Sequence, residues 1–264
     1  MLKRKKISKF LVILFLALFA LVFFIRQQYV VPILMYHSVN PQAKSQNRLE
    51  ISPEAFSRQM YFLKSHGYNV VPLESLGVLI KEHKKIPAKT IVITFDDGYK
   101  DNYTYAFPIL KKYNFPATLF IIVNEAGRPQ GDRLTWDEIM TMRDSGIINF
   151  GSHCLGPEPL TKIASEEEIK KEIFDSKNIL EDRLGREIKA FSYPEGRFND
   201  SIKNLVMKAG YKVAVVTSPG KRFPDNAIFA LKRLRISSTS DNLFVFWIET
   251  SGYYTFIKEH RDDD

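Results

Sequence analysis

The stretch Ile91-Val92-Ile93-Thr94-Phe95-Asp96-Asp97-Gly98-Tyr99 decides the fold of this 264-residue chain. Its first five residues form an apolar run without alternation, which is typical of a strand buried on both faces of a parallel sheet. Two adjacent carboxylates, Asp96 and Asp97, follow directly. Such groups repel each other unless a cation or a shared proton offsets the repulsion, and enzymes use this arrangement to separate two pKa values. The stretch therefore predicts a strand ending in a catalytic or metal-binding site, although a simple Asp-Gly turn remains an alternative.

Strand-like and helix-like segments alternate along the rest of the chain, which predicts an α/β fold with a parallel sheet. Helix starts are indicated by Ser52-Pro53 and by the capping-box patterns Thr135-x-x-Glu138 and Ser165-x-x-Glu168. Strands are expected at 31–36, 69–71, 90–95, 117–123, 148–152, 189–193, 211–217 and 234–237.

Four chemically active side chains follow three of these expected strands. His37 follows the first, Asp96 and Asp97 follow the third, and His153 follows the fifth. Because the carboxyl ends of parallel strands share one face of the sheet, where ligands bind, we expect these side chains to converge. One carboxylate pair and two histidines predict a hydrolytic metal site.

The N-terminal segment has the pattern of a membrane anchor. Residues 1–9 are basic and 10–25 are uncharged and almost wholly apolar. The segment predicts a basic cytoplasmic tail at 1–9 and a single-pass transmembrane anchor, or uncleaved signal, at 10–25. The catalytic domain at 31–250 and a C-terminal tail at 251–264 would then lie outside the cell membrane. A buried core helix is the alternative for 10–25.

The charge and cysteine content exclude two further classes. The formal net charge is +8, but five of those charges lie in residues 3–9, which leaves only +3 for the rest. A net charge this small indicates no clustered basic surface of the kind that binds nucleic acid. No nucleic-acid partner is therefore expected. Cys154 is the only cysteine, so the chain has no intrachain disulfide, and we interpret this residue as a packing residue.

Four motifs stand out along the chain: Thr94-Phe95-Asp96-Asp97-Gly98-Tyr99, Gly151-Ser152-His153, Phe191-Ser192-Tyr193-Pro194-Glu195-Gly196 and Val31-Pro32-Ile33-Leu34-Met35-Tyr36-His37. The first three resemble motifs of the NodB-like polysaccharide deacetylases, a carbohydrate esterase family. The fourth, near the N-terminus, resembles the branch that de-N-acetylates poly-N-acetylglucosamine, and the resemblance covers about 31–237.

The resemblance implies a fold, a cofactor and a role for each residue. The implied fold is a distorted (β/α) barrel, and the implied cofactor is a divalent metal, usually zinc, held by one Asp and two His. Asp96 would be the general base, Asp97 and His153 metal ligands, and His37 the acid that protonates the departing amine. The implied reaction is de-N-acetylation of N-acetylglucosamine units in an extracellular or cell-wall polysaccharide.

The sequence departs from the family pattern at two positions. Pro157 stands where the family has its second histidine ligand, and Glu195 stands where an aromatic residue is usual. Glu158 is a candidate replacement ligand, with an ordinary surface glutamate as the preferred interpretation. A catalytically impaired glycan-binding or assembly protein is therefore an alternative function. A barrel glycosidase is disfavoured because adjacent strand residues point to opposite sides.

Overall fold

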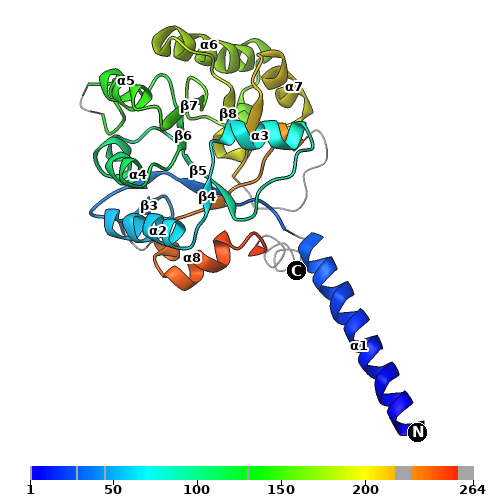
Figure 1. Ribbon diagram of the computed structural model, residues 1–264. Helices are drawn as coiled ribbons and strands as arrows, with labels where there is room; N and C mark the ends of the chain where they lie inside the picture. Colours follow the sequence, from blue (N-terminus) through cyan, green and yellow to red (C-terminus); the bar gives the residue numbers. More distant parts are fainter. Residues whose placement is uncertain (1, 28, 45, 130, 218–226, 255–264) are drawn as a thin grey trace.

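A computed structural model describes residues 2–27, 29–44, 46–129, 131–217 and 227–254 (Figure 1). Within these residues one helix leads into an α/β domain built on a parallel sheet. Most of the C-terminal tail expected at 251–264 lies outside the described residues.

The described residues contain an eight-stranded sheet in the order β10-β1-β5-β6-β7-β8-β9, with β4 paired to β5. Every pairing is parallel. Its strands are β1 (Ile33–Tyr36), β4 (Asn69–Val70), β5 (Thr90–Phe95), β6 (Ala117–Ile121), β7 (Ile148–Ser152), β8 (Ala190–Ser192), β9 (Val213–Val215) and β10 (Leu234–Arg235). All eight strands expected from the sequence are therefore confirmed, as is the α/β class.

The two ends of the strand order approach each other. Leu231, three residues before β10, forms a parallel bridge with Val215 of β9. The segment that pairs with β1 thus also contacts the opposite edge of the sheet, so the sheet curls. This arrangement is consistent with the distorted (β/α) barrel expected from the sequence.

Helices cover the sheet and begin at the capping residues that the sequence indicated. The Ser52 side chain accepts from Ala55 N at the start of α2 (Pro53–Ser65), and both capping-box bonds form at Thr135 before α5 (Trp136–Asp144). Ser165 caps α6 (Glu166–Leu184). The other described elements are α3 (Leu73–Lys81), η1 (Asn102–Ala106), α4 (Phe107–Tyr113), η2 (Leu160–Lys162), η3 (Pro194–Gly196), α7 (Asp200–Lys208), η4 (Ala227–Phe229), η5 (Ser238–Ser240) and α8 (Leu243–Thr250), with a small β2 (Ser38–Val39) and β3 (Glu50–Ile51) pair.

Apolar side chains fill both faces of the sheet. Ile33 and Val92 belong to one buried cluster, whereas their chain neighbours Leu34 and Ile93 belong to another. This alternation follows from the two-residue period of a strand. Burial on both faces explains why the sequence shows continuous apolar runs here.

The N-terminal helix α1 (Leu2–Gln27) projects away from the domain (Figure 1). Its described apolar side chains, from Leu11 to Ile25, are exposed. Among the described residues, no helix combines the length and the apolar character that crossing a membrane requires. The transmembrane anchor expected at 10–25 is therefore not confirmed.

Gly151 in β7 is a position where the fold admits no side chain. A Cβ atom there would lie 2.5 Å from Phe120 Cε1 and 2.8 Å from the carbonyl oxygen of Ala190. We predict that Gly151→Ala lowers the free energy of unfolding by about 1–3 kcal/mol, because both neighbouring strands must move apart. Urea denaturation measures this, with Gly156→Ala as the control, since its Cβ would meet only Glu172 Oε1 at 3.9 Å. Equal stability of the two variants would contradict the prediction.

Candidate active site

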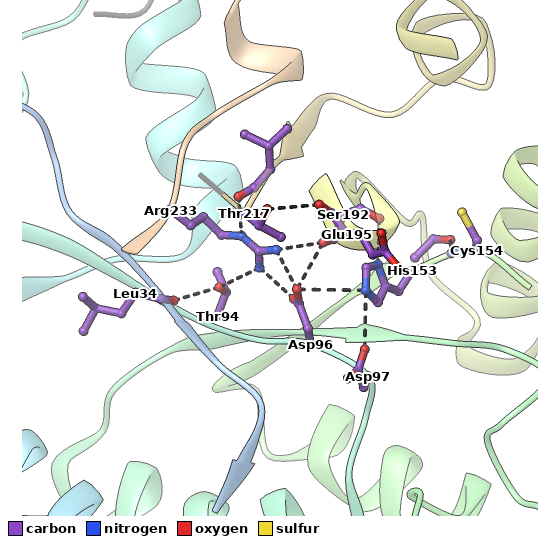
Figure 2. A network of polar contacts seen from close by, with 12 residues as sticks. Leu34, Thr94, Asp96, Asp97, His153, Cys154, Ser192, Glu195, Thr217 and Arg233 are labelled. Atoms are coloured by element: carbon purple, nitrogen blue, oxygen red, sulfur yellow. Dashed lines mark hydrogen bonds and ion pairs between the residues drawn. The ribbon is translucent and has the colours of Figure 1, made fainter. Parts of the chain in front are cut away.

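The carboxyl ends of the sheet strands bring the predicted side chains together. His37 follows β1, Asp96 and Asp97 follow β5, and His153 follows β7. Backbone hydrogen bonds continue the ladder into this region, with Asp96 N donating to Tyr36 O and His153 N to Ile121 O. Figure 2 shows Asp96, Asp97 and His153 together at this edge, and His37 is close enough to interact electrostatically with all three, so the expected convergence is present.

Asp96 is buried and held by a guanidinium that the sequence did not reveal. Arg233 Nη1 donates to Asp96 Oδ1 at 2.7 Å, and Nη2 donates to Oδ2 at 2.6 Å. This is a bidentate pair of two side chains with at most 1% exposure. Arg233 also donates to Thr94 Oγ1, Ser192 Oγ and the carbonyl oxygen of Val216 (Figure 2). The guanidinium is therefore fixed by three further acceptors.

The bidentate Arg233–Asp96 pair, called the clamp below, keeps Asp96 ionised. Burial acts to raise its pKa, but the charge and hydrogen bonds of Arg233, helped by His153 and His37, hold the pKa at about 2. At neutral pH Asp96 is consequently a carboxylate that can accept a proton.

Asp97 lies in a different environment. It has a left-handed backbone, with φ of 67°, and Gly98 follows with φ of 65°. Two successive left-handed residues turn the chain sharply after β5. Cys154 after β7 and Glu195 after β8 also have positive φ, so non-glycine residues in this uncommon region gather at the edge that carries the site.

His153 presents one ring nitrogen to both carboxylates. Its Nδ1 lies 2.8 Å from the carbonyl oxygen of Ser192, and since a carbonyl only accepts, Nδ1 carries the proton. Nε2 faces Asp97 Oδ1 at 3.5 Å and Asp96 Oδ2 at 4.0 Å (Figure 2). This tautomer leaves the Nε2 lone pair of the neutral ring directed at the acidic pair, as in a metal-binding histidine.

His37 is 8% exposed, and its Nδ1 has no hydrogen-bond partner among the described residues. Burial lowers its pKa, while the charges of Asp96 and Asp97 act in the opposite direction. Its backbone oxygen accepts from Asn102 Nδ2 at 2.7 Å, which fixes the strand end.

The loop after β7 contains the buried Cys154 and is held by Glu172 of α6. Cys154 is buried, and burial raises the pKa of its thiol, in agreement with its interpretation as a packing residue. Glu172 Oε2 accepts from Leu155 N and Gly156 N at 2.8 and 2.9 Å, so α6 fixes the loop that leads to Pro157.

The donor atoms fit two positions of a metal site. Donors on a tetrahedral zinc at about 2.0–2.1 Å lie roughly 3.3 Å apart, close to the 3.5 Å between Asp97 Oδ1 and His153 Nε2. Within the described part of the chain, no group of three or more His, Cys, Asp or Glu side chains could hold a metal. Glu158 is exposed and does not complete such a group. The described set is one protein ligand short of a catalytic zinc site.

An acidic pair facing a histidine, at the carboxyl edge of a curled parallel sheet, defines the class as an α/β hydrolytic enzyme. The profile of the family "Polysaccharide deacetylase" matches residues 83–214. The chain belongs to this family of carbohydrate esterases, which hydrolyse N-acetyl amide bonds.

Similar proteins support the assignment. YxkH of Bacillus subtilis, which is assigned to the polysaccharide deacetylases, is 34% identical over 83% of this chain and 76% of its own length. The poly-beta-1,6-N-acetyl-D-glucosamine N-deacetylase of Staphylococcus aureus is 29% identical over 78% and 74%. The structure of the Streptococcus pyogenes deacetylase PplD in complex with acetate matches 80% of this chain and 94% of its own, with a TM-score of 0.73 and 29% identity.

Acid unfolding tests the clamp. The pKa of Asp96 falls from 3.8 to about 2 on folding, so its contribution is complete above pH 3.8 and is lost as pH falls through 2. We predict that this group removes about 2 kcal/mol of unfolding free energy between pH 5 and pH 2. In Arg233→Met the remaining burial raises the pKa of Asp96, so the contribution of this group to stability instead increases as the pH falls.

Arg233→Met also costs about 3–5 kcal/mol at neutral pH because it leaves a buried charge unpaired. Urea unfolding at several pH values measures both effects. Arg235→Met is the matched control, since that arginine is exposed two residues away. Parallel pH profiles for the two variants would contradict the clamp.

Metal affinity tests the missing ligand. We predict that Pro157→His strengthens zinc binding at least tenfold, because it restores a third protein donor. Competition with a chromophoric chelator measures the affinity, and Glu158→Gln should leave it unchanged. Loss of affinity in Glu158→Gln would instead identify that carboxylate as a ligand.

Proposed function

We propose that this chain removes acetyl groups from N-acetylglucosamine units of a polysaccharide. The observation that carries the proposal is the Asp96-Asp97 pair facing His153 Nε2 at 4.0 and 3.5 Å in a member of the deacetylase family. The named substrate of the Staphylococcus aureus relative supports the choice of glycan.

In this proposal Asp96 is the general base. Its carboxylate is ionised and rigidly held. Oδ2 accepts from both Arg233 Nη2 and Ser192 Oγ, whereas Oδ1 keeps a lone pair beside its bond to Arg233 Nη1. A carboxylate with a pKa of about 2 is a weak base, so it removes a proton efficiently only from an acidified water. A divalent ion held by Asp97 and His153 would supply that acidity and polarise the acetamide carbonyl.

His37 would donate the proton to the departing amine. Its burial makes the protonated ring a stronger acid than an exposed imidazolium, which favours transfer to an amine. Arg233 acts as a positioning residue through Asp96 and does not itself touch the substrate in this scheme.

The alternative is a glycan-binding protein without turnover, and the observation in its favour is Pro157 at the expected ligand position. The ordered geometry of Asp96, Asp97 and His153 weighs against it. A protein without catalysis has no physical need for two carboxylates directed at one imidazole.

We also propose that the chain acts at the cell envelope, outside the cytoplasm. Support comes from the basic residues 3–9, the apolar residues 10–25 and the exposed apolar side chains of α1. The segment would serve as an export signal.

Acetate release tests the function. We predict that the detergent-purified full chain releases acetate from N-acetylglucosamine oligomers when zinc, cobalt or nickel is added. Asp96→Asn should lower kcat/KM at least 100-fold, because a general base contributes about 10²–10⁴-fold. An enzyme-coupled acetate assay measures both rates.

Asp144→Asn is the control for that experiment, since Asp144 lies in α5 and pairs with Arg143 at the surface. Circular dichroism establishes that Asp96→Asn is folded at the assay temperature. Retention of more than a tenth of the native rate by folded Asp96→Asn would remove Asp96 from the mechanism.

A further inference from the structure

A cavity of about 560 Å³ adjoins the active site and is not used by the chemistry proposed above. Its volume lies within the roughly 300–1,000 Å³ of small-molecule sites. One wall comes from Ser38 and the segment between β2 and β3, ending at Glu50. The opposite wall contains Tyr99, Asp101, Tyr105 and Asp132.

Two walls of the cavity continue directly from catalytic residues. Ser38 follows His37, and its Oγ donates to Asp101 Oδ2 at 2.5 Å. Asn102 Nδ2 then donates to both the His37 backbone oxygen and Asp101 Oδ1, at 2.7 and 3.0 Å. A ligand unit in the cavity would therefore lie next to the unit that reacts, since Ser38 and Tyr99 of its walls closely follow the site residues His37 and Asp97 in the chain.

The aromatic wall has the chemistry of a sugar site. Tyr99 lies two residues after Asp97, and the Arg133 guanidinium carbon lies 3.9 Å from its ring centroid. Tyr105 contributes a second ring with 36% exposure. Aromatic faces beside hydroxyl, amide and carboxylate groups are typical of small-molecule binding sites.

The charge of the cavity favours a cationic ligand. Its lining has three carboxylates, Glu50, Asp101 and Asp132, and one ammonium, Lys100. Asp132 pairs with Arg133 at 2.5 Å, and Lys100 lies 3.9 Å from Glu138. Asp101 and Glu50 accept hydrogen bonds from neutral groups. The donors to Asp101 are the Ser38 hydroxyl and the Asn102 amide, and the donor to Glu50 is the Lys44 backbone N–H. Burial raises the pKa of Asp101, the hydrogen bonds from Ser38 and the Val39 backbone act in the opposite direction, and the charges of Asp132 and Glu50 add smaller increases.

We infer that the cavity binds the neighbouring sugar unit of the glycan and selects a glucosamine unit with a free, protonated amine. This inference rests on the proposed function, because such a unit is the product of de-N-acetylation. Its consequence is that the chain acts preferentially beside a unit that has already been deacetylated. Deacetylation along one polysaccharide would then proceed in runs of adjacent units.

Defined oligosaccharides test the inference with the full chain in detergent. The substrates are the β-1,6-linked N-acetylglucosamine tetramer and its singly deacetylated positional isomers. One isomer should react with a kcat/KM at least fivefold above that of the fully acetylated tetramer. Asp101→Asn and Glu50→Gln should each bring the ratio of these two kcat/KM values close to one. A general loss of activity would lower both values alike and leave the ratio unchanged. Asp175→Asn, an exposed carboxylate in α6, should keep the native ratio.

Binding separates failure of the inference from failure of the function. Calorimetry should show that a singly deacetylated tetramer binds more tightly than the acetylated one, with a preference that weakens as salt increases. Selective binding without acetate release would overturn the function and leave the subsite intact. Acetate release with equal rates for all isomers, or a ratio unchanged in both variants, would overturn the subsite.

Discussion

The buried pair of Arg233 and Asp96 is the interaction on which the site depends. Taking two charges out of water costs several kcal/mol per ion, and only good geometry with further hydrogen bonds offsets that cost. Here the guanidinium contacts groups in or beside β5, β8 and β9, and it precedes β10. The pair therefore joins the strands where the sheet curls, and it fixes Asp96 for chemistry through the same contacts.

Adjacent carboxylates acquire different environments from a single turn. Asp96 continues the strand and lies 1% exposed against Arg233, whereas Asp97 adopts a left-handed backbone beside His153. The sequence argument anticipated a cation or a shared proton to offset their repulsion, and for Asp96 the cation is a guanidinium. Asp97 remains free to interact with a second cation.

The sequence predicted the features that depend on local pattern. Apolar runs located most of the sheet strands, and capping residues located α2, α5 and α6. Parallel topology brought His37, Asp96, Asp97 and His153 together. It did not predict Arg233, which lies 137 positions from Asp96 and has basic neighbours at Lys232 and Arg235. Only the tertiary fold makes one of these residues buried and another exposed. The cavity was likewise not predicted, because its walls come from separate loops.

The loss of a ligand at Pro157 need not remove the attraction of the site for a cation. Asp96 is paired with the Arg233 guanidinium through two hydrogen bonds, whereas the Asp97 carboxyl faces the His153 ring, with Oδ1 3.5 Å from Nε2. A neutral histidine at position 157 would have contributed a lone pair but no charge. Asp97, whose carboxyl can attract a cation from a distance, is therefore present. A histidine at position 157 would have added affinity for that cation only at short range. In the proposed function, Asp97 and His153 would hold a divalent ion that acidifies water and polarises the acetamide, and the protein would leave its other positions to water or substrate.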